Sequence, residues 1–586
     1  MRERGVGVVG PAVPTPAPDL QVIHHPDATA AERPPPTAPP EALAAPVAPA
    51  APTRPARWQR LRAVTFVAGA HAWAVTAVLA LIVALVGFRG GDFAAQDYRV
   101  WVFKTHGFLI WDVNWYGGHS DLGYSVLFPA VGSWLGTVPA AALAGVLSTI
   151  LWGRIVGPAT SWAAAVSRLW FAVFVVGDLI VGRAPFACAV TAALAAIYTV
   201  IRGRPELAGL AAVIASLFSP LGAAFLVLIG IVWSPSIGWR RALPLAGSFV
   251  GLAITALVGD GGIFPFPWTG FVGQLTIVAL GLAATPRAQP VVRRALWLYG
   301  AICVALFLVP NPVGGNMARL TGMVIGPVAA YVLLRAGRVH ALAVLTVPLL
   351  AFQLQPVVAA VASAAGDLST KAGYYHGMLH YLSRHDWPLG RVEIPFTRDH
   401  WEATYVAEQQ PLARGWDRQV DVARNAELYQ PLSASAYHDW LRDNAVRYVA
   451  LPDAPLDQGG KAEDVLLRHA PSYLKPVYSD AHWRIWQVVD ATPLASGVGA
   501  MTALTPSGFT ISQPKAGATL VRLRWSQSWK VDSGWACLAQ APAGWTTVVA
   551  FTSGDVIVSA RTHLDSVDAC TPAELANAGV ALPSAS

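Results

Sequence analysis

A succession of long apolar runs constrains the fold of this chain more than any other feature. The 586 residues are 54% hydrophobic and only 13% charged, and the mean hydropathy is +0.46. A soluble protein usually carries about 25% charged residues. Several runs approach the roughly 20 apolar residues that a helix needs to cross a bilayer. The sequence therefore predicts an α-helical polytopic membrane protein.

Basic residues between the apolar runs predict the topology. Arginine clusters lie at residues 54–62, 202–204, 240–241, 287–294 and 335–338. Loops rich in Lys and Arg stay on the cytoplasmic side of a membrane, so we place all of these clusters inside. This path puts the N-terminus in the cytoplasm and the C-terminal region outside the plasma membrane. The net charge of +7 then reflects topology, and no nucleic-acid partner is expected.

About eleven spans fit this path. The runs at 205–218 and 220–234 are short and meet at Ser219 and Pro220, so they are either two tilted helices or one helix broken at the proline. The arginine pattern favours two, because losing one span would place the later basic loops outside. We expect spans at residues 64–88, 138–154, 161–181, 184–201, 205–218, 220–234, 241–258, 268–285, 291–309, 319–335 and 339–363.

Composition divides the chain into four regions. Residues 1–56 are dominated by Pro and Ala, which predicts a disordered cytoplasmic tail. Residues 57–363 form the transmembrane domain, which includes a large outer loop at 89–137. Residues 364–490 predict an extracytoplasmic α/β region, and residues 491–586 predict a β-rich, β-sandwich-like region.

The four cysteines fall into two classes. Cys188 and Cys303 lie inside apolar runs, where we expect them to be inert. Cys537 and Cys570 lie in the β-rich region. Outside the cytoplasm the environment is oxidising, so we expect a disulfide bond between these two.

The loop at 89–137 is unusually rich in acidic and aromatic residues. Asp92 follows the first predicted span closely and is preceded by two glycines, which let the backbone bend so that the carboxylate can face the helices. Tryptophan and histidine rings suit stacking on sugars, but they also form interfacial belts at membrane surfaces, and the acids would then be merely solvated. The candidate residues here are the carboxylates Asp92 and Asp97 for catalysis, and Gln96, Trp115 and His119 for substrate binding.

Further polar residues lie at or near the ends of later spans. Charged groups within a membrane are costly and usually face the helix bundle. Arg183 is a candidate for binding a lipid phosphate, although Asp178 and Arg183 can also form a mutual structural ion pair. In the segment at 310–320, Asn311 and Asn316 can bind hydroxyl groups and Arg319 can bind phosphate, unless the segment is an ordinary turn. No nucleotide-binding or metal-ligand motif is present, so any need for a divalent metal stays open.

The layout resembles the GT-C superfamily of membrane glycosyltransferases. A cytoplasmic N-terminus, a first helix and a large outer loop with an early Asp are shared features, and they cover residues 89–363, followed by an extracytoplasmic domain. More closely, the segments GGDFAAQDYR, WYGGHSDLGYSVLFP, GRAPF, FSPLGAAF and PNPVGGNMARL resemble a group of largely uncharacterised actinobacterial multi-spanning membrane proteins. The resemblance implies a polyprenyl-phosphate-linked sugar as donor and a catalytic carboxylate in the first loop. The adjacent acidic pair of many members is missing, since Asp92 and Asp97 are five residues apart.

Two classes of function follow from these features. The first is a glycosyltransferase that moves a sugar from a polyprenyl-phosphate donor to an envelope glycan or lipid acceptor, with Asp92 as general base and Arg183 and Arg319 holding the phosphate. The alternative is a transporter or flippase of envelope precursors, or a non-catalytic envelope assembly protein. The two halves of the membrane domain show no repeat, which disfavours transport. Membrane lipids, the lipid-linked donor and the acceptor are the expected partners.

Overall fold

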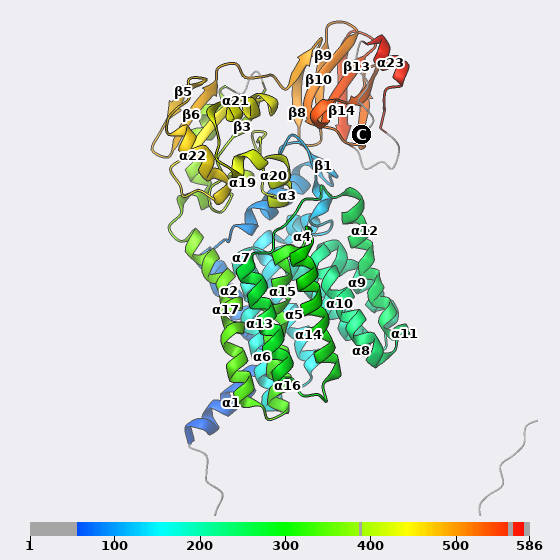
Figure 1. Ribbon diagram of the computed structural model, residues 1–586, viewed down its shortest axis with the longest axis vertical. Helices are drawn as coiled ribbons and strands as arrows, with labels where there is room; N and C mark the ends of the chain where they lie inside the picture. The colour runs from blue at the N-terminus through cyan, green and yellow to red at the C-terminus, as the bar shows by residue number, and fades with distance from the viewer. Residues whose placement is uncertain (1–55, 386–388, 561–566, 579–586) are drawn as a thin grey trace, which may run out of the picture. The chain divides into compact units, whose positions relative to one another are not determined.

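The chain changes from helices to strands along its length. The computed structural model describes residues 56–385, 389–560 and 567–578. Figure 1 shows helices in the blue-to-green part of the chain, mixed elements in the yellow part and strands in the orange-to-red part. This order is the predicted one: an α-helical membrane domain, then an α/β region, then a β-rich region. The predicted disordered tail lies outside the described residues except for Ala56.

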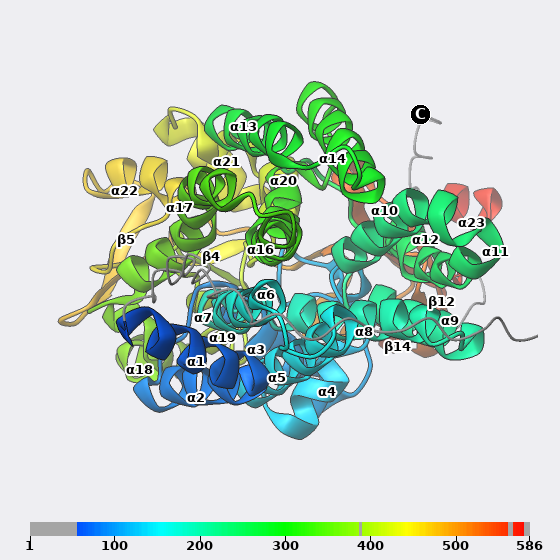
Figure 2. The same ribbon diagram turned by 90° about the horizontal axis from the view of Figure 1, so that it is seen from below.

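Eight helical segments in the described part of the chain are long and apolar enough to cross a membrane. Figure 2 views many of them nearly end-on, with α16 packed beside both α6 and α17. The segments are α5 (Thr137–Val156), α6 with α7 (Trp162–Phe174, Val176–Val181), α8 (Ala184–Ile201), α10 (Pro220–Ile237), α11 with η2 and α12 (Trp239–Ala242, Leu243–Ser248, Phe249–Val258), α14 (Pro290–Leu308), η3 with α15, η4 and α16 (Gly314–Met317, Ala318–Leu320, Thr321–Ile325, Gly326–Arg335) and α17 (Val339–Ala364).

Two apolar helices are shorter than a full span. These are α9 (Pro205–Phe218) and α13 (Trp268–Ala284). The run at 205–234 is thus two helices, as predicted, because α9 ends at Phe218 and Pro220 starts α10. Proline fits the first turn of a helix, where its missing N–H has no partner to lose. Length and apolarity alone therefore support fewer spans among the described residues than the predicted eleven.

The first predicted span is not one helix. The run at 64–88 is divided between α1 (Ala56–Ala70) and α2 (Ala72–Val86), which are bent by 79° at His71. Close packing explains the position of the bend, because a Cβ at Gly69 would lie 2.8 Å from the Cα of Ala165 on α6. Arg168 donates to the carbonyl of Ala70 at 3.3 Å and so provides a partner for a group at the broken helix end.

The predicted outer loop is mostly ordered secondary structure. It contains α3 (Asp92–His106), β1 (Trp111–Asp112), β2 (His119–Ser120), η1 (Asp121–Gly123) and α4 (Phe128–Leu135). One side of α3 is buried, and α3 packs against α4 and α19. The loop is therefore a folded layer between the membrane helices and the C-terminal regions.

A four-stranded mixed sheet with surrounding helices forms the α/β region. The strand order is β3-β4-β6-β5, with β3 parallel to β4 and the other pairs antiparallel. Its strands are β3 (Arg391–Glu393), β4 (Val446–Pro452), β5 (Leu474–Ser479) and β6 (Trp483–Val488). Its helices are η5 (Leu368–Thr370), η6 (Ala372–Tyr375), α18 (His376–Ser383), α19 (Glu402–Tyr405), α20 (Arg418–Arg424), η7 (Ala426–Tyr429), α21 (Ala434–Asp443), η8 (Gln458–Gly460) and α22 (Lys461–Leu467).

The last region is a β-sandwich. Two four-stranded antiparallel sheets, β12-β13-β10-β7 and β11-β14-β9-β8, enclose a core that includes Phe509, Trp529 and Val548. Cys537 and Cys570 form the expected disulfide bond, with Cα atoms 4.9 Å apart. The elements are β7 (Ala495–Gly497), β8 (Ala500–Thr505), β9 (Gly508–Gln513), β10 (Gly517–Arg524), β11 (Trp529–Ser533), β12 (Ala536–Gln540), η9 (Pro542–Gly544), β13 (Trp545–Ala550), β14 (Gly554–Ala560) and α23 (Pro572–Asn577).

The folded loop after α3 binds both C-terminal regions. The indole of Trp115 donates to the carbonyl of Ala403 at 3.0 Å, and the backbone of Leu412 donates to Asn114 at 2.8 Å. The backbone of Arg524 in the sandwich donates to Gly117 at 2.7 Å. These bonds hold the loop between the membrane helices and the C-terminal regions.

Candidate functional site

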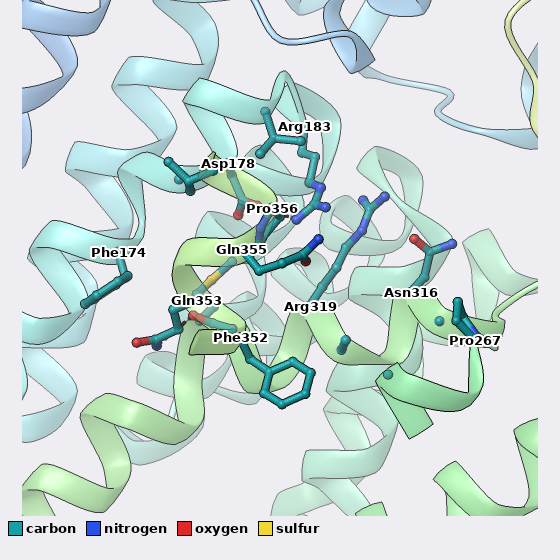
Figure 3. Close-up of a pocket in the computed structure, with 18 of the residues that line it drawn as sticks. Phe174, Asp178, Arg183, Pro267, Asn316, Arg319, Phe352, Gln353, Gln355 and Pro356 are labelled. Carbon is teal, nitrogen blue, oxygen red and sulfur yellow. Dashed lines mark hydrogen bonds and ion pairs between the residues drawn. The ribbon is translucent and has the colours of Figure 1, made fainter. Parts of the chain in front are cut away.

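A cavity of about 280 Å³ lies among the membrane helices, where charged side chains collect at their ends. Its wall comes from α6–α7, the segment before α13, η3–η4 and α17. Figure 3 shows the guanidinium groups of Arg183 and Arg319 pointing toward each other in this cavity. The lining residues are Phe174, Gly177, Asp178, Val181, Arg183, Phe264, Phe266, Pro267, Gly270, Gly315, Asn316, Ala318, Arg319, Gly322, Met323, Phe352, Gln353, Gln355, Pro356 and Val357.

Asp92 meets both arginines of this cavity. Its Oδ2 lies 3.7 Å from Nε of Arg183 and 4.0 Å from Nη2 of Arg319. Both separations are too long for hydrogen bonds, and the Nε atoms of the two arginines have no hydrogen-bond partner among the described residues. Buried N–H donors are nearly always paired in native proteins. The pair of guanidinium groups is therefore suited to an anionic ligand, such as a phosphate.

Local backbone geometry places Arg183 at the start of α8. Gly182 has φ +97° and closes the end of α7, with its N–H bonded to the carbonyl of Asp178 at 3.0 Å. The backbone of Arg183 donates to the same carbonyl at 2.8 Å, and Pro185 follows in the first turn of α8. Glycine is the usual residue for a positive φ at a helix end. The sequence GRAPF thus ends one helix and starts the next, with the arginine between them.

Glycines also let Asp92 approach this turn. A Cβ at Gly90 would lie 2.4 Å from the carbonyl oxygen of Ile180, and a Cβ at Gly182 would lie 2.5 Å from the amide nitrogen of Phe93. Only glycine fits at these two positions, because any other residue would place a Cβ at these short distances. The start of α3 therefore rests directly on the turn between α7 and α8, which brings Asp92 to Arg183.

A different segment of the chain, α15, positions Arg319. It lies on α15, a short α-helical segment between a 3-10 turn and the π-helical turn η4. Its guanidinium lies over the ring of Phe186, 5.5 Å from the centroid. Interruptions of this kind in an α-helix occur often at functional sites. Asn316, in the same segment, lines the cavity.

Asp178 is a second carboxylate in the cavity wall. Its Oδ1 lies 3.6 Å from Nη1 of Arg183, so the ion pair that the sequence offered as an alternative is present. Its Oδ2 has no hydrogen-bond partner among the described residues. Arg183 therefore lies between two carboxylates, Asp92 and Asp178, while Arg319 pairs with Asp92 alone.

Asn311 does not reach the cavity. Its amide nitrogen donates to the carbonyls of Leu306 and Val309, and its carbonyl oxygen accepts from the backbone of Val313 and Gly314. These four bonds occupy the side chain in closing the end of α14. That Asn311 binds substrate stays a prediction, and in this structure the turn itself uses the donors and acceptors of its side chain.

Trp115 and His119 are buried and do not line the cavity. Trp115 stacks on Tyr98 at 4.5 Å and on His119 at 5.2 Å between ring centroids, so neither ring face is free for a sugar. Burial and the nearby arginines lower the pKa of His119 well below its usual value. That these rings contact substrate stays a prediction, and in this structure both are buried in the folded loop.

The other loop candidates are also separate from the arginine pair. Asp97 lies 3.1 Å from Nη1 of Arg89, and burial raises the pKa of its carboxyl. Gln96 is buried on α3. Neither residue lines the cavity. Among the loop candidates, only Asp92 contacts Arg183 and Arg319.

Sequence reasoning missed the part of the wall that comes from α17. Gln353 donates to the carbonyl of Gly322 in the π-turn at 2.8 Å and accepts from the indole of Trp170 at 2.9 Å. Gln355 also lines the cavity. Two glutamines and Pro356 within an apolar run were the available signal, because polar residues inside a span usually face the bundle.

Metal binding finds no support in the described ranges. No group of three or more His, Cys, Asp or Glu side chains suited to a metal ion occurs among residues 56–385, 389–560 and 567–578. The cavity contributes only Asp178 of these residue types.

Comparison with known proteins gives structural similarities only. No family model and no curated protein matches the sequence. ArnT from Cupriavidus metallidurans in the apo state is similar over 70% of this chain and 97% of that chain, at 13% identity and TM-score 0.38. The same protein bound to undecaprenyl phosphate is similar over 75% and 100%, at 14% identity and TM-score 0.36.

A third similar structure is the oligosaccharyltransferase of Archaeoglobus fulgidus, tethered to an acceptor peptide containing the NVT sequon. It is similar over 66% of this chain and 69% of that chain, at 11% identity and TM-score 0.40. Scores at this level assign no chemistry to the present chain, so its function has to be argued from the residues of its own cavity.

Proposed function

We propose that this protein is a membrane glycosyltransferase that moves a sugar from a polyprenyl-phosphate donor to a cell-envelope glycan or lipid acceptor on the outer face of the membrane. One observation carries the proposal: Asp92 lies 3.7 Å and 4.0 Å from the guanidinium groups of Arg183 and Arg319. A base beside two anion-binding side chains, all near helix ends, suits a reaction that releases a phosphate at the membrane surface.

Each side chain has a distinct role in this reaction. The acceptor hydroxyl attacks the anomeric carbon of the sugar while the bond from that carbon to the phosphate oxygen breaks. Asp92 takes the hydroxyl proton as general base. The phosphate leaves with the bonding electrons, and Arg183 and Arg319 stabilise the charge that develops on it. Asn316 and Gln355 offer amide groups in the same cavity for orienting the donor.

Transport is the second class of function, and the cavities favour it less. A cavity of about 360 Å³ lies elsewhere among the helices, with lining residues that include Leu228, Leu296 and Val328. Apart from Thr285 and Tyr299 its lining is apolar, so it offers no polar path for a hydrophilic substrate. An apolar cavity suits a lipid chain.

The proposal is tested by an assay with purified protein, radiolabelled polyprenyl-phosphate sugars and an envelope fraction as acceptor. Transfer of label that requires an intact Asp92 supports the proposal. An exposed aspartate on α21, Asp439, supplies the matched control variant Asp439→Asn. If no donor gives labelled product with the wild type, the enzyme hypothesis fails. Equal label with Asp92→Asn would instead show that the base lies elsewhere.

A further inference from the structure

A second polar cavity of about 220 Å³ lies where α17 leaves the membrane domain and the α/β region begins. Ser363 and Asp367 line it from the end of α17 and the following turn, and Tyr374 lines it from η6. Arg398 and Asp453 complete the wall from the segment after β3 and the end of β4. None of its lining residues belongs to the cavity that contains Arg183 and Arg319.

Two carboxylates supply hydrogen-bond acceptors in this second cavity. Asp367 is 7% exposed, and its Oδ1 accepts from the backbone and hydroxyl of Ser369 at 2.8 and 2.7 Å. Its Oδ2 has no hydrogen-bond partner among the described residues. Asp453 accepts from the hydroxyl of Tyr374 at 2.6 Å and lies 3.2 Å from the ring of His482. A buried carboxylate oxygen without a donor is costly, which suggests that a ligand supplies one.

Arg398 supplies a charged hydrogen-bond donor in the same wall. Arg398 is exposed, and no carboxylate of the described residues lies within ion-pair distance of its guanidinium. Its backbone is fixed, because its N–H donates to the carbonyl of Pro455 at 2.8 Å. The hydroxyls of Ser363 and Tyr374 donate within the protein, to the carbonyl of Ala360 and to Asp453, so they offer a ligand chiefly acceptor oxygens. The ring of Tyr374 is packed against Trp483 at 5.2 Å between centroids, which holds it in place.

We infer that this cavity binds a hydroxyl-rich glycosyl unit that carries no negative charge. Sugar hydroxyls donate and accept at once, so they match a wall that combines two carboxylates, a guanidinium and two hydroxyls. Asp367 and Asp453 against Arg398 leave the wall with one excess negative charge, which repels phosphate and carboxylate ligands. The cavity with Arg183 and Arg319 has the opposite preference, so the two cavities select different chemical groups.

Asp399 lies near the start of α3, although it lines neither cavity. It follows Arg398 in the chain, and its Oδ1 would lie 3.2 Å from a Cβ at Gly91, next to Asp92. Asp399 is buried, and burial raises the pKa of its carboxyl to about 6, while a hydrogen bond from Ser363 opposes the rise. The glycosyl unit bound in the second cavity is then the acceptor, an assignment that rests on the proposed function, whereas the binding itself does not.

The inference is tested by ligand-observed NMR with the full-length protein in nanodiscs, because sugar-based detergents would occupy the cavity. The probes are the methyl glycosides of glucose, mannose and galactose, glucosamine, and glycerophosphoethanolamine as a lipid head group. At least one sugar should bind in about the millimolar range. Arg398→Ala and Tyr374→Phe should weaken that binding about fivefold or more, since the first removes a donor and the second removes the hydroxyl that holds Asp453 in the wall. Arg384→Ala, an exposed arginine outside the cavity, should bind as the wild type does.

The possible results separate the hypotheses. Absence of binding for all sugars, equal binding by Arg398→Ala and the wild type, or binding of glycerophosphoethanolamine alone each overturns the inference. If Arg398→Ala does not fold, Tyr374→Phe, which keeps the ring and its packing, decides the question. Sugar binding without any transferase activity would refute the proposed function and leave the binding site standing. Transferase activity without sugar binding would refute the binding site and leave the proposed function standing.

Discussion

The carboxylate of Asp92 lies 3.7 Å from the guanidinium of Arg183, across the contact between the start of α3 and the turn between α7 and α8. The two groups attract each other without sharing a hydrogen bond. An anion can therefore use the arginine donors while the carboxylate stays nearby as a base. The contact depends on glycine at Gly90 and Gly182, because a side chain at either position would separate the two segments.

Asp92→Asn should abolish sugar transfer and leave donor binding largely intact. Asparagine keeps the size of the side chain but cannot accept the acceptor proton, and a general base typically contributes 10²–10⁴-fold to a rate. Initial rates with labelled donor, and donor binding measured separately, check this. Asp439→Asn should keep the wild-type rate. Full activity of Asp92→Asn would assign the base elsewhere, with Asp97 as the remaining sequence candidate.

Arg319→Ala should weaken donor binding. A charge-assisted hydrogen bond contributes about 1.5–3 kcal/mol, so the Kd for a polyprenyl-phosphate sugar should rise roughly 10- to 100-fold. The matched control is Arg335→Ala, which removes an exposed arginine from the far end of the same segment. Equal donor affinity in both variants would show that Arg319 does not contact the phosphate.

Gly182→Ala should destabilise the protein more than Gly157→Ala. Both glycines have a positive φ, +97° and +91°, so both substitutions carry a backbone cost of about 1–2 kcal/mol. Only at Gly182 would the new Cβ meet the start of α3, 2.5 Å from the nitrogen of Phe93. We expect an extra cost of about 1–3 kcal/mol and a loss of transfer activity. Equal shifts in thermal unfolding would contradict the close contact.

The stability of the extramembrane part should fall as pH rises, and Glu402 should contribute. Burial raises the pKa of its carboxyl from 4.5 to about 8. Between these values the folded state holds the proton and the unfolded state has released it, so the free energy of unfolding falls as pH rises, by up to about 1.4 kcal/mol per pH unit. Glu402→Gln should flatten thermal unfolding against pH between about 5 and 8. An unchanged slope would show that Glu402 is ionised when folded.

Residues 288 and 435 should lie on opposite sides of the membrane. Ala288 is exposed beside Arg287 in a loop predicted to be cytoplasmic, and Ser435 is exposed on α21 in the region predicted to be outside. In intact cells an impermeant maleimide should label Ser435→Cys and should label Ala288→Cys only after the cells are opened. The native cysteines do not interfere, since Cys188 and Cys303 are buried and the other two are bonded. The reverse labelling pattern would overturn the topology.

Local sequence was enough to predict the membrane domain and the order of the regions. An apolar run must satisfy its backbone inside the bilayer, so length and hydropathy predict helices without knowledge of their neighbours. The gap between the predicted spans at 161–181 and 184–201 likewise marked the turn at Gly182 and Arg183, where Gly182 has φ +97°, a backbone conformation that glycine adopts at no steric cost. The disulfide bond followed from two cysteines in one β-rich region that the sequence predicts to lie outside the cytoplasm.

Contacts between distant segments decided which candidate residues lie together and where the first apolar run bends. Trp115 and His119 have rings of the kind that stack on sugars, but tertiary packing stacks these two rings on each other inside the folded loop. The side chain of Asn311 forms its hydrogen bonds within its own turn. The kink at His71 arises from packing against α6, which hydropathy cannot register. The sequence by itself predicted the apolar helical segments and the order of the regions. Only the tertiary structure decided that Asp92 meets Arg183 and Arg319, because that meeting depends on the packing of three segments far apart in the chain.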